Sequence, residues 1–135
     1  MMAKKVIFLD DSKSILKTIS YTVADLVNEG LITMQYYDDS RVFATDMCEG
    51  TVDFDILFSD INMPDISGYD ICTLARTLDT YKDKMIIALT TEISDSSKKL
   101  GKDAGFNGWI TKISSPEVMK TTIANTIRAI NAKGK

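Results

Sequence analysis

The stretch from Phe54 to Gly68 contains the carboxylate on which the chemistry of this chain is expected to centre. Residues 56–59 form a short, mostly apolar run bounded by turn formers, which predicts a buried strand of a parallel sheet. The strand stops at Asp60, and a loop containing Pro64 follows at once. Ligands of open α/β sheets lie outside the carboxyl ends of the strands. Asp60 is therefore predicted to be exposed at the edge of the sheet formed by the carboxyl ends of the strands, which we call the functional rim.

Two further aspartates, Asp10 and Asp11, directly follow the apolar run Val6–Leu9. If the first and third strands are neighbours, all three carboxylates meet, and they repel one another unless protonation or a cation relieves the repulsion. The chain has no histidine, and its two cysteines fit no metal-ligand spacing. A hard divalent ion such as Mg²⁺, held by oxygen, is therefore expected. Taken singly, each aspartate could equally be a solvated strand-end residue or a helix N-cap.

Two more side chains are predicted at the same rim, because Thr90 ends the fourth predicted strand and Lys112 follows the fifth. A hydroxyl and an ammonium beside a carboxylate-bound metal form a set that binds phosphoryl oxygens and neutralises their charge. Alone, Thr90 could be a strand terminator and Lys112 a surface lysine. Their convergence with the three aspartates favours phosphoryl chemistry.

Alternating strands and helices are expected to position these residues. Strands are predicted over 6–9, 32–36, 56–59, 85–89 and 109–110, and helices over 12–29, 40–49, 69–80 and 94–104, with a last helix opened by Ser115-Pro116-Glu117. The last helix is expected to turn a stripe toward the core: Val118, Met119, Ile123, Ile127 and Ile130. The 94–104 helix is polar, with little apolar face. This pattern predicts a doubly wound (βα)5 three-layer sandwich of the flavodoxin-like type, with one parallel five-stranded sheet of order 2-1-3-4-5.

Length and composition are those of one soluble globular domain. The 135 residues suit a single domain over 1–135, with no output domain after it. The net charge of −3 argues against a nucleic-acid binder, which needs a basic surface. No apolar segment approaches the ~20 residues of a membrane span. The two cysteines, Cys48 and Cys72, are expected to be reduced, and the protein to be cytoplasmic.

In these features the chain resembles response-regulator receiver domains, and among them the stand-alone chemotaxis regulators. The matching residues are Asp10-Asp11, Asp60-Ile-Asn62-Met-Pro64 with Gly68, Thr90 and Lys112. The resemblance covers essentially the whole chain. It implies a signalling protein, not an enzyme, that catalyses only its own phosphorylation and dephosphorylation. A sensor histidine kinase would be the phosphoryl donor, because this chain has no histidine of its own.

The resemblance also implies a role for each matching residue. Asp60 would be the phospho-acceptor. Asp11, Asp60 and the backbone carbonyl of Asn62 would bind Mg²⁺, and Asp10 would act mostly through a water on that ion. Lys112 would pair with the phosphoryl group.

The same resemblance predicts the response to phosphorylation. Thr90 would move to hydrogen-bond a phosphoryl oxygen, and Trp109 occupies the aromatic switch position of the family, although core packing on an edge strand is the alternative for its side chain. The signal would pass to a separate partner, such as a flagellar motor switch in a chemotaxis-type system. The surface used would comprise the 94–104 helix, Trp109 and the last helix. A monomer is expected.

The chain departs from the family pattern at two positions. Ile113 stands where the family usually has a proline after its lysine, so a trans bond or a strained one is expected there, since a cis bond before a non-proline residue costs about 2.5–4 kcal/mol. Thr91, which follows the rim threonine, is bulkier than the usual small residue and could narrow access. Asn62 and Glu92 occupy positions at which the family tunes acyl-phosphate hydrolysis, and this pair predicts a short-lived signal.

Other functions remain as alternatives. A phosphorelay intermediate or phosphate sink would use the same site. An aspartyl-phosphate phosphatase of the haloacid-dehalogenase type needs D-x-D after its first strand, whereas this chain has Asp10-Asp11-Ser12. A flavodoxin-like cofactor binder needs a hydroxyl- and glycine-rich loop there, and the two aspartates would repel its phosphate in the absence of a metal.

Overall fold

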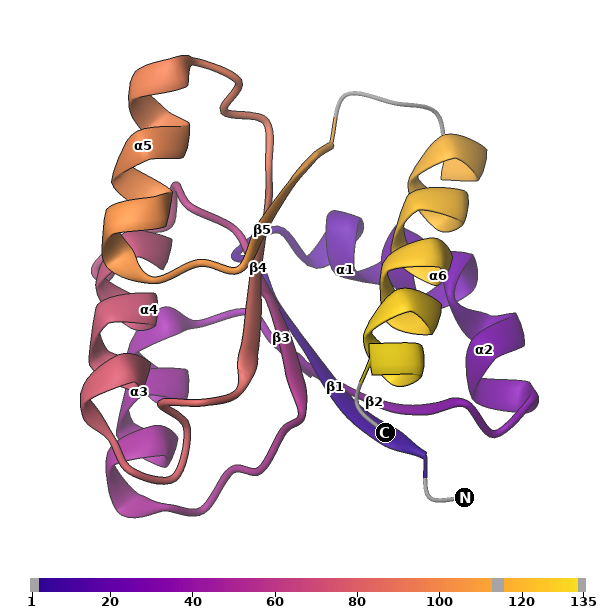
Figure 1. Cartoon of the computed structure of the whole chain (residues 1–135), viewed down its shortest axis with the longest axis horizontal. Helices are drawn as coiled ribbons and strands as arrows, with labels where there is room; N and C mark the ends of the chain where they lie inside the picture. The colour runs from indigo at the N-terminus through magenta and orange to yellow at the C-terminus, as the bar shows by residue number, and fades with distance from the viewer. Residues whose placement is uncertain (1–2, 113–115, 134–135) are drawn as a thin grey trace.

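A sheet of five parallel strands forms the centre of the computed structural model, which describes residues 3–112 and 116–133 (Figure 1). The strands are β1 (Lys4–Leu9), β2 (Ile32–Tyr37), β3 (Ile56–Ser59), β4 (Met85–Thr90) and β5 (Gly108–Thr111). Their order is β2-β1-β3-β4-β5, which confirms the predicted order 2-1-3-4-5.

Helices cover both faces of this sheet. They are α1 (Lys13–Thr22), α2 (Ala24–Asn28), α3 (Ser40–Glu49), α4 (Gly68–Thr77), α5 (Asp95–Ala104) and α6 (Pro116–Lys133). Figure 1 shows α1, α2 and α6 on one side of the sheet and α3, α4 and α5 on the other. The predicted doubly wound, three-layer arrangement is confirmed.

The sheet divides the core into two apolar layers. Successive side chains of a strand point to opposite faces, so Val6 and Phe8 of β1 join the layer under α1, α2 and α6, whereas Ile7 and Leu9 join the layer under α3 and α4. All four side chains are buried. The inner strands β1, β3 and β4 are thus apolar on both faces, which is why they read as apolar runs in the sequence, whereas the edge strand β2 mixes polar and apolar residues.

The first predicted helix, over 12–29, is in fact two helices. α1 ends at Thr22, and α2 begins at Ala24, with Val23 between them at φ −102° and ψ 6°. The hydroxyl of Thr22 donates to the carbonyl of Thr18 at 2.8 Å, a bond that competes with the helical ladder and bends helices. The break lets both Val23 and Leu26 reach the core, whereas apolar spacing alone predicted one continuous helix.

One residue of the predicted α6 stripe was misplaced. Val118 is 52% exposed, whereas Met119, Ile123 and Ile127 are buried. The buried positions recur every four residues along one helical face, and Val118 lies one residue away from that face. The prediction counted Val118 as core together with its neighbour Met119, but of these two residues only Met119 is buried.

Most other boundaries agree with the prediction to within two residues. The exception is α4, which ends at Thr77 instead of residue 80, because Leu78 adopts an extended conformation at φ −99° and ψ 123°. The expected N-cap at Ser115 and the geometry expected at Ile113 lie outside the described residues. α6 does begin at Pro116, as predicted.

Candidate functional site

Strand pairing brings Asp10 and Asp60 together. Leu9 and Ser59, the last residues of β1 and β3, are paired across the sheet, so each aspartate is the first residue beyond its strand. The backbone N–H of Asp60 donates to the carbonyl of Leu9 at 2.9 Å. The N–H of Asp10 donates to the carbonyl of Tyr37 at 3.0 Å. The predicted juxtaposition of the first and third strand ends is thus present.

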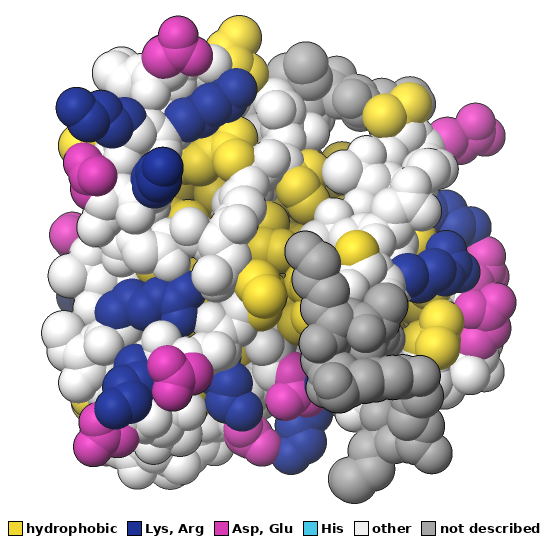
Figure 2. All heavy atoms as spheres, viewed as in Figure 1, with side chains coloured by type: hydrophobic (Ala, Val, Ile, Leu, Met, Phe, Trp, Pro, Cys, Tyr) yellow, Lys and Arg dark blue, Asp and Glu magenta, His cyan; other side chains and the backbone are white. Residues whose placement is uncertain are grey.

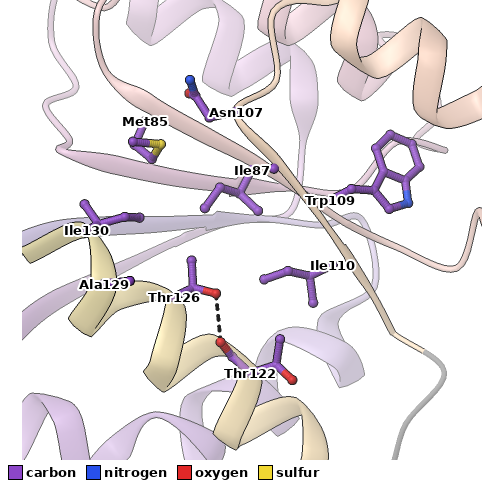
Figure 3. A pocket seen from close by; sticks show the side chains of 10 residues that line it. Met85, Ile87, Asn107, Trp109, Ile110, Thr122, Thr126, Ala129 and Ile130 are labelled. Carbon is purple, nitrogen blue, oxygen red and sulfur yellow. Dashed lines mark hydrogen bonds between the residues drawn. The ribbon is translucent and has the colours of Figure 1, made fainter. Parts of the chain in front are cut away.

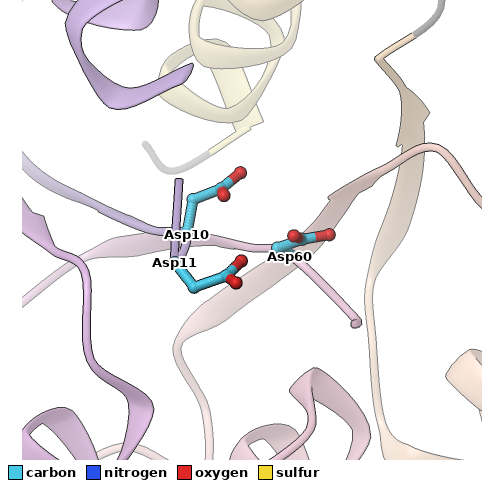
Figure 4. A group of neighbouring side chains, drawn as sticks. All are labelled: Asp10, Asp11 and Asp60. Atoms are coloured by element: carbon cyan, nitrogen blue, oxygen red, sulfur yellow. The ribbon is translucent and has the colours of Figure 1, made fainter. Parts of the chain in front are cut away.

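The three predicted carboxylates form one cluster (Figure 4). One oxygen from each of Asp10, Asp11 and Asp60 lies within 4.8 Å of the others. The Asp10 side chain is buried and accepts the N–H of Ser12 at 3.0 Å. Asp60 accepts the N–H of Ile61 at 2.8 Å, and Asp11 is exposed. Backbone donors therefore fix the two inner carboxylates, while the outer one faces solvent.

Lys112 supplies the opposing charge. Its Nζ contacts Asp10 Oδ2 and lies 3.3 Å from Asp60 Oδ2. Its backbone N–H donates to the carbonyl of Thr90 at 2.8 Å, which fixes the chain at the end of β5. The ammonium is almost fully buried, so the pairing is protected from solvent screening.

Burial is the main influence on the ionisation of Asp60. Removal from water raises the pKa of this carboxyl above its ordinary value. The nearby Lys112 ammonium acts in the opposite direction, and the Asp10 carboxylate adds to the increase in the pKa. One lysine thus compensates only part of the charge of three aspartates.

The donor set suits a hard cation. Carboxylate oxygens are the ligands that Mg²⁺ and Ca²⁺ take in proteins, and Asp11 leaves one side of the cluster open to water. Three carboxylates and one ammonium leave an uncompensated negative charge that a divalent ion would neutralise. Asn62 is exposed on the loop two residues beyond Asp60. The residues present therefore fit the expected magnesium ion.

Thr90 lies at the same rim but is fully buried. Its Oγ1 accepts the N–H of Glu92 at 3.2 Å, so the hydroxyl is tied to the loop that follows β4. Thr91 is exposed on that loop. Glu92 is tied further: its carbonyl accepts the indole N–H of Trp109 at 2.9 Å, and its Oε1 accepts the Ser97 hydroxyl at 3.0 Å.

Gly68, a residue of the recognised motif, is required by close packing against the aspartate loop. A Cβ at this position would lie 2.1 Å from the backbone oxygen of Asp60 and 2.9 Å from Ile61 Cα. The Gly68 N–H also donates to the carbonyl of Ile61 at 2.9 Å. The first turn of α4 is thereby held directly against the loop that carries Asp60.

Sequence reasoning missed the contacts made by Ser97 and Tyr69. Besides its bond to Glu92, Ser97 accepts through its carbonyl the hydroxyl of Tyr69 at 3.0 Å. Ser97 lies in a serine-rich run that has the composition of a solvated helix start, and its partner Tyr69 is 28 residues away. Only the tertiary structure identifies this contact.

A groove of about 730 Å³ lies between β5 and α6 (Figure 3). Apolar side chains line most of it, among them Met85, Ile87, Ile110 and Ile130. Figure 2 shows hydrophobic side chains gathered in the middle of this face, between α5 and α6, with Lys and Arg side chains on the α5 side. The groove is separate from the aspartate cluster.

Comparison with known proteins identifies the family. The sequence pattern of the response regulator receiver domain matches residues 6–124. The chain is 26% identical over 130 residues to the chemotaxis protein CheY homolog of Campylobacter jejuni, covering 96% of this chain and 97% of that one. It is 28% identical over 116 residues to chemotaxis protein CheY1 of Helicobacter pylori, covering 86% and 90%. The structure of chemotaxis protein CheY4 of Vibrio cholerae matches with a TM-score of 0.76 and 33% identity, covering 93% of this chain and 98% of that one.

The chain belongs to the response regulator receiver domain family. It is a CheY-like receiver domain of two-component signalling, as the resemblance of its motifs predicted. None of the helices within the described ranges combines the length and apolar character that a membrane span requires.

Proposed function

We propose that Asp60 accepts a phosphoryl group from a phospho-histidine of a sensor kinase, and that the phosphorylated protein signals by altered binding to a separate target. The observation that carries this proposal is the placement of Asp60. Its carboxylate is oriented by the N–H of Ile61, lies 3.3 Å from the Lys112 ammonium and shares a cluster with Asp10 and Asp11.

The transfer exchanges one bond for another. A carboxylate oxygen of Asp60 forms a bond to phosphorus as the bond between phosphorus and the histidine nitrogen breaks, and that nitrogen keeps the electron pair and takes up a proton. Asp60 must be ionised to attack, and the Lys112 ammonium favours the ionised form. Lys112 then lies beside the phosphoryl oxygens, whose charge it neutralises.

The aspartate cluster is proposed as the magnesium site. Asp11, Asp60 and the backbone carbonyl of Asn62 would hold the ion, supported by Asp10. When bound, Mg²⁺ supplies charge neutralisation for the carboxylates and the incoming phosphoryl group. The number of acidic side chains in the cluster supports this assignment, because Lys112 alone does not balance three carboxylates.

The response is proposed to begin at Thr90. A phosphoryl group adds about −1.5 to −2 charges and strong acceptor oxygens. A turn of the Thr90 hydroxyl toward one of these oxygens would perturb the bond that it accepts from Glu92. The Glu92 loop contacts both β5 and α5. The change would therefore reach the face formed by α5, β5 and α6, which carries the apolar groove of Figure 3.

The target is proposed to be a protein of a chemotaxis-type system. Similarity to the named chemotaxis proteins along nearly their full lengths supports this choice. The signal is proposed to be short-lived, with Asn62 and Glu92 setting the rate of hydrolysis. A phosphorylated form that persisted for hours would contradict this short lifetime.

Intact mass spectrometry tests the central step. The protein is incubated with Mg²⁺ and acetyl phosphate, in parallel with Asp60→Asn and, as a matched control, Asp70→Asn on the exposed surface of α4. The expected result is a magnesium-dependent gain of one phosphoryl group in the native protein and the control, but not in Asp60→Asn. Turnover of a generic phosphate ester, measured in the same samples, would instead indicate the phosphatase alternative.

A further inference from the structure

α5 buries little apolar surface. Among its residues only Gly101 is buried, and Leu100 is 57% exposed. A helix that buries so little apolar surface must owe its position to a few specific contacts. The most closely packed of these contacts is made by Gly101.

Gly101 lies directly against the indole of Trp109. A Cβ at position 101 would be 2.6 Å from Cζ3 and 3.0 Å from Cε3 of that ring. No other residue type fits without displacing the indole. Figure 3 shows the Trp109 ring on the opposite side of β5 from Ile110, so the ring lies on the α5 side of the sheet, while the residue also borders the groove.

The same indole is tied to the loop after β4. Its N–H donates to the carbonyl of Glu92 at 2.9 Å, and the N–H of Glu92 donates to the hydroxyl of Thr90. The Glu92 carboxylate accepts the hydroxyl of Ser97, in the first turn of α5. Trp109 thus contacts both the helix and the loop, and the loop contacts the helix a second time.

We propose that Gly101 and Trp109 form a size-matched pair that couples α5 to the Thr90–Glu92 loop, and that during signalling the indole keeps its rotamer and both of these contacts, so that ring, helix and loop move together. The part of this inference that concerns signalling rests on the proposed function. The packing of the pair does not. Rotation of the indole would break its bond to Glu92 and leave an unfilled space beside Gly101, at the cost of the contacts on both sides.

The pair can be tested in the unphosphorylated protein. Alanine is the better helix former, so helix propensity alone predicts that Gly101→Ala raises the melting temperature. The pair predicts the opposite, a fall of several degrees with a shift in the fluorescence of Trp109, the sole tryptophan. In a Trp109→Phe background the smaller ring makes room, and Gly101→Ala should then raise the melting temperature.

The matched control is Gly108→Ala. A Cβ at this position would lie 3.7 Å from Ile87, an ordinary contact, so the indole should stay in place. A rise in melting temperature for Gly101→Ala in the native background, with unchanged fluorescence, would overturn the proposed size-matched packing of Gly101 and Trp109.

The coupling is tested by hydrogen exchange and fluorescence quenching with and without Mg²⁺ and acetyl phosphate, with intact mass recorded for each sample. The expected result is altered amide exchange in both the 90–92 loop and α5, with no change in the access of acrylamide to Trp109. In Gly101→Ala the mass gain should remain, whereas the α5 response should be lost.

An indole that becomes more accessible while α5 exchange stays constant would overturn the coupling and favour a rotating side chain. Absence of any mass gain would contradict the proposed function. The melting experiments would still show whether Gly101 and Trp109 are packed as a size-matched pair.

Discussion

Arg76 of α4 and Asn107, the residue before β5, are joined by a bond of 2.7 Å from Nη2 to Oδ1. The same Asn107 oxygen accepts the N–H of Ile86 at 2.8 Å. Arg76 also donates to the carbonyls of Gly105, Lys82 and Lys84, at distances from 2.7 to 3.0 Å. One guanidinium thus fastens the end of α5 and the starts of β4 and β5 to α4.

Replacing Arg76 by Lys is expected to lower the free energy of unfolding by about 2–3 kcal/mol. An ammonium cannot reproduce the fork of donors, and hydrogen bonds to charged groups contribute about 1.5–3 kcal/mol each before compensation by water. Urea denaturation measures the change. The control is Arg41→Lys, whose partner Asp65 is 3.5 Å away on the exposed surface and should contribute less than about 1 kcal/mol. Equal effects of the two substitutions would contradict the stabilising role assigned to the hydrogen bonds of Arg76.

Replacing Lys112 by Met is expected to destabilise the protein in the presence of EDTA by about 3 kcal/mol. The substitution leaves Asp10 and Asp60 facing each other without the buried ammonium, and breaking such a pair costs about 3–5 kcal/mol. Mg²⁺ should restore part of the loss, because binding to the folded state alone stabilises that state. Thermal melts with and without Mg²⁺ measure both effects.

Lys120→Met serves as the control, because that lysine pairs with Asp25 on the exposed surface. It should change the melting temperature little and should not alter the response to Mg²⁺. A Lys112→Met variant that gained nothing from Mg²⁺ would argue against a cation site at the cluster.

Replacing Gly68 by Ala is expected to impair both stability and phosphoryl transfer. The added methyl group would meet the backbone of Asp60 at 2.1 Å, so the aspartate loop or α4 must shift. Overpacking of this kind costs about 1–3 kcal/mol or more. Initial rates of mass gain with acetyl phosphate, compared with Gly108→Ala, measure the effect on transfer. A variant with native rate and stability would show that the loop tolerates the shift.

The two cysteines are expected to differ in reactivity. Burial raises the pKa of Cys72 to about 11, from an ordinary value of 9.0, and Cys48 is exposed. Because the thiolate is the nucleophile, iodoacetamide at pH 8.5 should add one group to the folded protein and two in urea. Cys48→Ser should take up none when folded. Rapid labelling of Cys72 in the folded protein would contradict its burial.

The same shift predicts a pH dependence of stability. A folded-state pKa above the unfolded value means that the unfolded thiol ionises first as the pH rises. The contribution of Cys72 to stability is thus fully present below pH 9 and is lost as the pH rises toward about 11. Cys72→Ala should lose less stability over this interval, as measured by urea denaturation at several pH values.

The sheet and the rim residues could be predicted because they depend on local patterns. The inner strands β1, β3 and β4 are apolar runs, and Asp10, Asp60 and Thr90 lie at or just beyond their ends, so the sheet order brings these residues together. The break between α1 and α2 was missed because the apolar spacing continues through it, with Ile19, Val23 and Leu26 all buried.

Contacts between residues far apart in the sequence were also missed. The donors of Arg76 reach carbonyls up to 29 residues away, and the hydroxyl of Tyr69 in α4 reaches the carbonyl of Ser97 in α5, 28 residues away. Polar side chains of this kind have the composition of solvated surface, and the sequence carries no periodic signal that would pair them.

The small buried area of α5 has a consequence for the diversification of this protein. Most residues of the helix are exposed, among them Lys98, Lys99 and Leu100. Mutation can therefore change the chemical character of these exposed positions at little cost in stability, provided that Gly101 and the contacts of Ser97 are kept. A chain with the same interior could thus acquire a new recognition specificity through a handful of substitutions on one helix.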